Sequence, residues 1–367
     1  MAVGVVGLVV ATSCAPKNSI GSVPPAHSVS GAEVALRAGM SAGPGLLWES
    51  DAEQNADLAG IQNSGARWIN IDIDWNSIQG DGPNSFRWDR ATDRVVLNAR
   101  AHGLSILGMA AYSPPWARVA GCGELHCLPA NADDYGRFLT AAAARYGSRS
   151  SNPLLRNTIT TWQLWNEPNH REFAQPKPNP DLYTAMLKSA YPGIKAVDPT
   201  ATVVTGGTAP APDAPDGTDY KPETWLRDLY ARGARGSFDA IAHHPYAFPV
   251  NPLEPHPWNA YTQTLVLHDI MASNGDGAKK IWGTEMGAPT GTASDVVTEA
   301  QQAQWVHDYY LGWNTTFRSF TGPLIWMELR DSGTNVADKW QNLGLLHRDR
   351  RAKPAYSAFQ TVMRNGV

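Results

Sequence analysis

The chain lacks the features that mark nucleic-acid-binding and disordered proteins. It has no extended run of Lys or Arg, its formal net charge is -4 and its pI is about 6.2. No positive surface is therefore expected for a phosphate backbone. Hydrophobic residues make up 43% and charged residues 17% of the 367 residues, which excludes a mainly disordered chain. We expect a sizeable core and no nucleic-acid partner.

Cysteine is scarce too, with three in the whole chain. Cys122 and Cys127 lie in GCGELHC at 121–127, a spacing short enough for a disulfide within one loop, which fits an oxidising compartment. A zinc site of Cys122, His126 and Cys127 is the alternative, but it has no evident fourth ligand. We favour the disulfide and expect no metal.

The N-terminus has no apolar run long enough to cross a bilayer. Residues 1–10, MAVGVVGLVV, have the length of a signal-peptide core. Small residues precede Cys14, as in a bacterial lipoprotein signal, although no Lys or Arg precedes the run and Ala11 stands where Leu or Val is usual. We expect 1–14 to be a signal peptide or lipoprotein signal. The protein would then be secreted, or tethered to the membrane at the cell surface through a lipidated Cys14.

Small, polar and proline-rich residues at 15–33 are typical of a flexible tether. From Val34 onward, apolar runs of strand length alternate with amphipathic runs of helical length, which indicates a parallel sheet covered by helices. The predicted strands are 36–40, 68–73, 105–110, 160–165, 202–206, 240–244, 280–284 and 323–327. The predicted helices are 56–64, 90–102, 133–146, 182–197, 223–231, 261–273, 299–313 and 354–363. We predict that 34–367 form one domain, a (β/α)8 TIM barrel.

Two glutamates stand where this fold places its chemistry, at the carboxyl ends of the strands. Glu167 follows the fourth predicted strand and Glu285 the seventh, so the two can face one bond from opposite sides of the barrel mouth. Cleavage of a glycosidic bond with retention needs one protonated carboxyl and one ionised carboxylate about 5 to 5.5 Å apart. The 14 Trp and 12 Tyr suit a sugar ligand as well, since aromatic faces pack against sugar rings, although most of them would serve the core.

In these motifs the sequence resembles the clan A glycoside hydrolases, in particular the cellulase-like family 5 and the xylosidase-like family 39. The resemblance covers nearly all of 34–367. It rests on WNEPN at 165–169, WGTEMG at 282–287, HPY at 244–246, Trp326, and the closing GLLHRDRRAKPAYSAF at 344–359.

The resemblance implies a role for each matching residue. Glu167 would be the acid/base and Glu285 the nucleophile, while Asn166 would bind the sugar 2-hydroxyl. His244 and Tyr246 would hydrogen-bond around the nucleophile and keep it ionised. A further residue, Trp326, would form the floor under the sugar.

Other residues near the strand ends are candidates without an assigned role. Trp75 and Trp116 are expected either to stack on sugar or to pack in the core. Glu328, Asp72 and Asp74 are expected to support the site or to touch substrate. Many relatives carry an arginine on the second strand, where this chain has NID at 70–72, so the sugar specificity of those relatives does not transfer.

We therefore expect an exported retaining glycosidase that needs no cofactor and acts on a polysaccharide or oligosaccharide, with endo action on β-linked glycans favoured. The alternatives are an exo-acting β-xylosidase-like or β-glucosidase-like enzyme, a transglycosylase, and a carbohydrate-binding protein without activity. A single barrel needs no partner to bury its core, so a monomer is expected.

Overall fold

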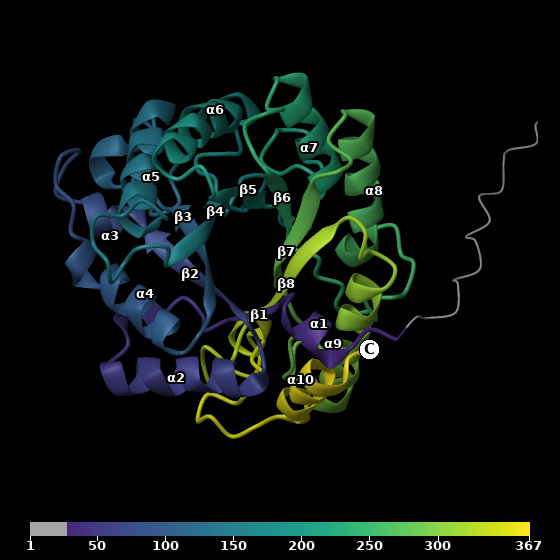
Figure 1. Cartoon of the computed structure of the whole chain (residues 1–367). Helices are drawn as coiled ribbons and strands as arrows, with labels where there is room; N and C mark the ends of the chain where they lie inside the picture. The colour runs from purple at the N-terminus through teal and green to yellow at the C-terminus, as the bar shows by residue number, and fades with distance from the viewer. Residues whose placement is uncertain (1–27) are drawn as a thin grey trace, which may run out of the picture.

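A computed structural model describes residues 28–367, which form a closed barrel of eight parallel strands in chain order, with β8 pairing back onto β1 (Figure 1). The strands are β1 Ala38–Ser41, β2 Trp68–Asp74, β3 Ser105–Ala111, β4 Ile159–Asn166, β5 Thr202–Gly207, β6 Ala240–His243, β7 Lys280–Met286 and β8 Thr321–Trp326. The predicted (β/α)8 fold is confirmed, because every predicted strand is present and its bounds differ by a few residues at most.

Helices surround the ring of strands on its outside (Figure 1). They are α1 Gly31–Ala35, α2 Asp51–Ser64, α3 Trp75–Gln79, α4 Thr92–Ala101, α5 Ala132–Tyr146, α6 Pro180–Val197, α7 Pro222–Ala231, α8 Ala260–Ser273, α9 Glu299–Asn314 and α10 Pro354–Asn365. Local sequence fixes several starts: Ser50 and Thr298 each form a capping box, with Glu53 and Gln301 respectively, which satisfies amide groups that a helix start leaves free. The short helices α1 and α3 were not predicted.

The domain begins earlier in the chain than the sequence predicts. Val29 is buried, and its backbone exchanges two hydrogen bonds with Val367, at 2.9 and 3.1 Å. Ser30 then caps α1. Residues 28–33 are thus part of the barrel domain and not of the expected tether. The expected signal, Cys14 and the rest of the tether lie outside the described residues.

The loop after β3 carries the disulfide between Cys122 and Cys127. This confirms the pairing predicted from their spacing, and because both sulfurs are bonded to each other, the zinc alternative is wrong. Within residues 28–367, no helix combines the length and the apolarity needed to cross a bilayer.

Candidate active site

Glu167 and Glu285 lie at the same rim of the barrel because their strands run parallel. Glu285 is a residue of β7, and Glu167 comes directly after β4 with a left-handed backbone, φ 40°. The Glu167 amide donates a hydrogen bond to the Gly207 carbonyl at 3.0 Å, which fixes the turn against the end of β5. Both side chains are mostly buried and line the same cavity.

A histidine and a tyrosine that follow β6 connect the two carboxyl groups. His244 Nδ1 lies 2.8 Å from Glu167 Oε1 and 3.6 Å from Glu285 Oε2, while the Tyr246 hydroxyl donates to Glu285 Oε2 at 3.2 Å. One oxygen of each glutamate and one His244 nitrogen all lie within 4.8 Å of one another. The His244 ring lies so close to Gly207 that a Cβ there would be 2.1 Å from Nε2, so a glycine is needed at this position.

Burial dominates the protonation of this pair. Removal from water raises the pKa of Glu167 to about 7 and that of Glu285 to about 7, because a charged carboxylate is disfavoured in a medium of low polarity. His244 and the Tyr246 hydroxyl act on Glu285 in the opposite direction. Burial lowers the pKa of His244, which keeps its ring neutral. Near neutral pH the two glutamates therefore hold about one proton between them.

The structure describes only one group of three or more His, Cys, Asp or Glu side chains that are close enough to hold a metal ion. Its members are Glu167, His244 and Glu285. Their oxygen and nitrogen atoms already serve as hydrogen-bond partners within the site. The geometry is therefore explained without a metal.

A cavity of about 430 Å³ opens above the pair and is lined from strands all round the barrel. Asn166 and Tyr246 line it, as expected for residues that contact a sugar. The side-chain oxygen of Asn166 is buried and has no hydrogen-bond partner among the described residues. His244 is fully buried and does not line the cavity, and its Nδ1 faces the two carboxyl groups.

The structure departs from the role expected of Trp326, and it places Trp75 and Trp116 in the packing alternative. Trp326 is fully buried, donates to the Leu343 carbonyl at 3.2 Å and does not line the cavity. Met327 lines the cavity in its place, because the Trp326 ring packs edge-on against Tyr309 of α9. Trp75 is fully buried beside Phe138, and Trp116 packs edge-on against Trp75, so neither forms part of the cavity wall.

Other aromatic residues line the cavity. Trp340, from the loop after β8, lines the cavity with its side chain half exposed, and its ring packs edge-on against Tyr246 and Phe248. Tyr112 and Phe173 line the other side. These residues were not predicted, since the one signal in the sequence was a large apolar side chain in a loop of polar residues.

The two acidic residues of β2, Asp72 and Asp74, have different roles. Asp72 lines the cavity, while Asp74 caps α3 by accepting from the Ser77 amide at 3.1 Å. Asn70 lines the cavity from the same strand, near where relatives carry an arginine. Glu328, the second residue after β8, lines the cavity as well, in agreement with its expected place.

No protein-family model matches the chain, and no curated protein matches it in sequence. Solved structures do match. A family 39 glycoside hydrolase from the gut symbiont Bacteroides cellulosilyticus WH2 has a TM-score of 0.69 and 22% identity over 93% of this chain and 65% of that one. This chain thus spans just under two thirds of that protein's length.

Two further structures have the same fold. A monomeric beta-xylosidase from Caulobacter crescentus CB15 has a TM-score of 0.66 and 15% identity, covering 91% of this chain and 69% of that one. GH5_18 from Streptomyces cattleya in complex with GlcNAc has a TM-score of 0.64 and 18% identity, covering 90% and 80%. At such identities these likenesses establish the fold, and the neighbours come from the two families that the sequence motifs resemble.

Proposed function

We propose that this chain is a retaining glycoside hydrolase with Glu285 as nucleophile and Glu167 as acid/base. The observation that carries the proposal is a pair of buried carboxyl groups facing one cavity, with oxygens within 4.8 Å of each other. Retaining enzymes hold this pair about 5 to 5.5 Å apart, whereas inverting enzymes need about 6.5 to 9.5 Å to admit a water. The spacing favours a covalent glycosyl-enzyme intermediate.

The contacts of the two glutamates support this division of roles. The Tyr246 hydroxyl donates to Glu285 and so favours its ionised form, which attacks the anomeric carbon. As Glu285 attacks, the bond between the anomeric carbon and the leaving oxygen breaks, and Glu167 transfers its proton to that oxygen. Once Glu285 is an ester its charge is gone, which lowers the pKa of Glu167 and allows Glu167 to take a proton from the water that attacks next. Glu285 leaves as a carboxylate.

We propose endo action on a β-linked polysaccharide outside the cytoplasm. The half-exposed ring of Trp340 at the cavity offers a second sugar a place beyond the cleavage site, which supports a substrate of several residues. The disulfide supports export. Exo action is the near alternative, since a cavity of this volume also fits a chain end.

A second candidate is a carbohydrate-binding protein on the same scaffold. One observation favours it: the negative charge of Asp72 raises the pKa of Glu285, whereas relatives place an arginine on this strand. A nucleophile held protonated would bind sugar without cleaving it. Direct activity measurements separate the two candidates.

The test is cleavage of β-glucans, xylans, mannans and bacterial exopolysaccharides by the purified protein and its variants. We expect Glu285→Gln and Glu167→Gln to lose at least about a thousandfold in kcat on the glycan that is cleaved. Glu124→Gln, an exposed residue outside the cavity, is the matched control and should keep full activity. Release of short oligomers from intact chains would establish endo action. Binding without cleavage by the unsubstituted protein would refute the hydrolase and favour the binding protein.

A further inference from the structure

The charged side chains of the cavity wall are mostly acidic. Five carboxyl side chains line it, and within residues 28–367 no Lys or Arg does. The five are Asp72, Glu167, Glu172, Glu285 and Glu328. Only two are needed for the proposed reaction, so the remaining three must affect which ligand enters.

Glu328 and Asp72 flank the end of β1, since Glu328 follows β8 by two residues and Asp72 lies on β2. Glu328 lies so close to Gly43 that a Cβ there would be 2.1 Å from Oε2. Gly43 also has a left-handed backbone, φ 88°, so a glycine at this position makes room for the carboxyl group. Asn70 lines the same side, and its side-chain oxygen has no partner among the described residues.

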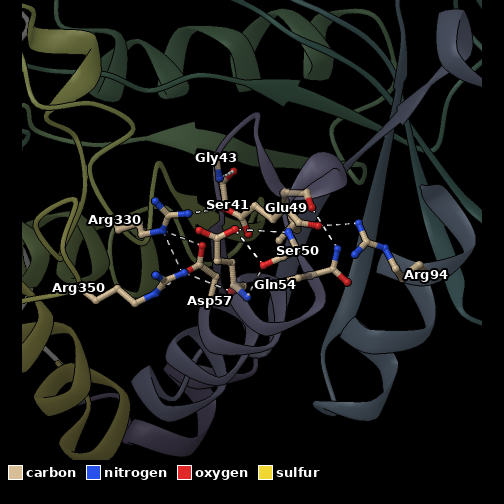
Figure 2. Close-up of polar contacts among 11 residues, drawn as sticks. Ser41, Gly43, Glu49, Ser50, Gln54, Asp57, Arg94, Arg330 and Arg350 are labelled. Carbon is tan, nitrogen blue, oxygen red and sulfur yellow. Dashed lines mark hydrogen bonds and ion pairs between the residues drawn. The ribbon is translucent and has the colours of Figure 1, made fainter. Parts of the chain in front are cut away.

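The cations nearest to this side of the cavity already have partners. Arg330 contacts both Asp57 and Glu49, and Arg350 reaches Asp57 at 2.8 Å (Figure 2). Arg330 is almost fully buried, so its guanidinium cannot turn toward a ligand without leaving those carboxylates unpaired. Among the described residues, the one basic side chain that lines the cavity is His170. Its Nε2 lies 3.7 Å from Asp219 Oδ1.

We propose that the cavity selects neutral sugars or amino sugars and rejects sugars that carry a carboxylate or sulfate, and that Asp72 and Glu328 impose this choice. This inference rests on the proposed function and names its substrate class. A carboxylate or sulfate here would lose its hydration without gaining a cation, and it would face like charges in a medium of low polarity. Sugar hydroxyls and ammonium groups can donate to the same carboxylates.

The raised pKa values of Asp72 and Glu328 also disfavour an anionic ligand. Burial raises the pKa of Asp72 to about 7 and that of Glu328 to about 8, so these groups already resist carrying charge. An anionic ligand would raise both values further, and binding it would require proton uptake. A neutral sugar meets no such requirement.

The test is the binding of matched tetrasaccharides to Glu285→Gln by calorimetry above pH 8, where the wall is ionised. The probes are β-1,4-linked tetramers of glucose, glucosamine and glucuronate, and of mannose and mannuronate. We expect each uronate to bind at least about tenfold more weakly than its neutral partner. Adding Asp72→Asn and Glu328→Gln should bring the affinity for each uronate closer to that for its neutral partner, whereas adding Glu124→Gln should leave the difference unchanged.

Both added substitutions keep the shape of the side chain, and an unchanged Tm would show that the variants fold. A uronate that binds as tightly as its neutral partner, or no binding of any tetramer, would overturn the inference. Failure of the proposed function has a different signature, since no glycan would then be cleaved by the unsubstituted protein. Cleavage of a uronate polymer would overturn the inference and leave the hydrolase in place.

Discussion

Glu167 and Glu285 differ in two contacts: His244 Nδ1 lies nearer to Glu167, and the contact that favours a charged Glu285 comes from Tyr246. Both are buried and both have raised pKa values, but the Tyr246 hydroxyl donates only to Glu285. A hydrogen bond to the ionised form favours that form. At the scale of single residues, this one hydroxyl distinguishes the nucleophile from the acid.

Removing that hydroxyl should therefore weaken the nucleophile. In Tyr246→Phe the pKa of Glu285 rises, and since the ionised form attacks, the acidic limb of the kcat/KM profile moves to higher pH. Loss of a hydrogen bond to a charged group should lower kcat/KM at pH 6 about tenfold. Tyr356→Phe is the control, because the Tyr356 hydroxyl donates a hydrogen bond to the Gly60 carbonyl and neither residue lines the cavity. An unchanged profile for Tyr246→Phe would mean that this contact does not govern the charge of Glu285.

Trp340 should matter only for ligands that reach beyond the cleavage site. We expect Trp340→Ala to raise KM for a tetrasaccharide about fivefold while leaving the hydrolysis of a small aryl glycoside nearly unchanged. Trp258→Ala is the matched control, because Trp258 is also half exposed but lies outside the cavity wall. Equal loss on both substrates would contradict a role in binding a second sugar.

At the scale of elements, a buried ion network joins the segment after β8 to α2. Arg330, only two residues beyond Glu328, contacts Asp57 of α2 and Glu49 before it (Figure 2). Its side chain is 5% exposed, whereas that of Arg350, the second partner of Asp57, is 34% exposed. The network therefore holds one wall of the cavity against its supporting helix.

The two arginines provide a matched pair of substitutions. Arg330→Met leaves the carboxylate of Glu49 buried without its partner and should lower the free energy of unfolding by about 3 kcal/mol. Arg350→Met should cost less than about 1 kcal/mol, because its guanidinium is partly in water. Chemical denaturation of both variants measures the difference. Equal losses would show that burial does not set the strength of this network.

At the scale of the whole molecule, the barrel could be predicted from the alternation of apolar and amphipathic runs, since buried parallel strands and covering helices leave distinct patterns. The positions of Glu167 and Glu285 at strand ends followed from it. What could not be predicted was which residues at the end of a strand face the cavity. Met327 lines it where Trp326 was expected, because the Trp326 ring packs against Tyr309 of α9. The pairing of Asp57 with Arg330 is 273 residues apart in sequence and leaves no local signal.

The start of the domain also depends on a long-range contact. Val29 and Val34 are buried, and Gly31 lies against the backbone of Met363 and Arg364. A chain that begins at residue 36 should have a Tm about 5 °C or more below that of a chain beginning at residue 28, because two buried valines are lost. Calorimetry of the two chains is the measurement. Equal Tm values would show that residues 28–35 do not contribute to the stability of the domain.

The pairing of Val29 with Val367 has a consequence for orientation. The chain enters the barrel through α1, just before the first residue of β1, and so on the face where all the strands begin. The cavity lies on the opposite face, where they end. A group joined directly to the start of the domain would therefore lie on the face opposite the mouth of the cavity and would leave that mouth open.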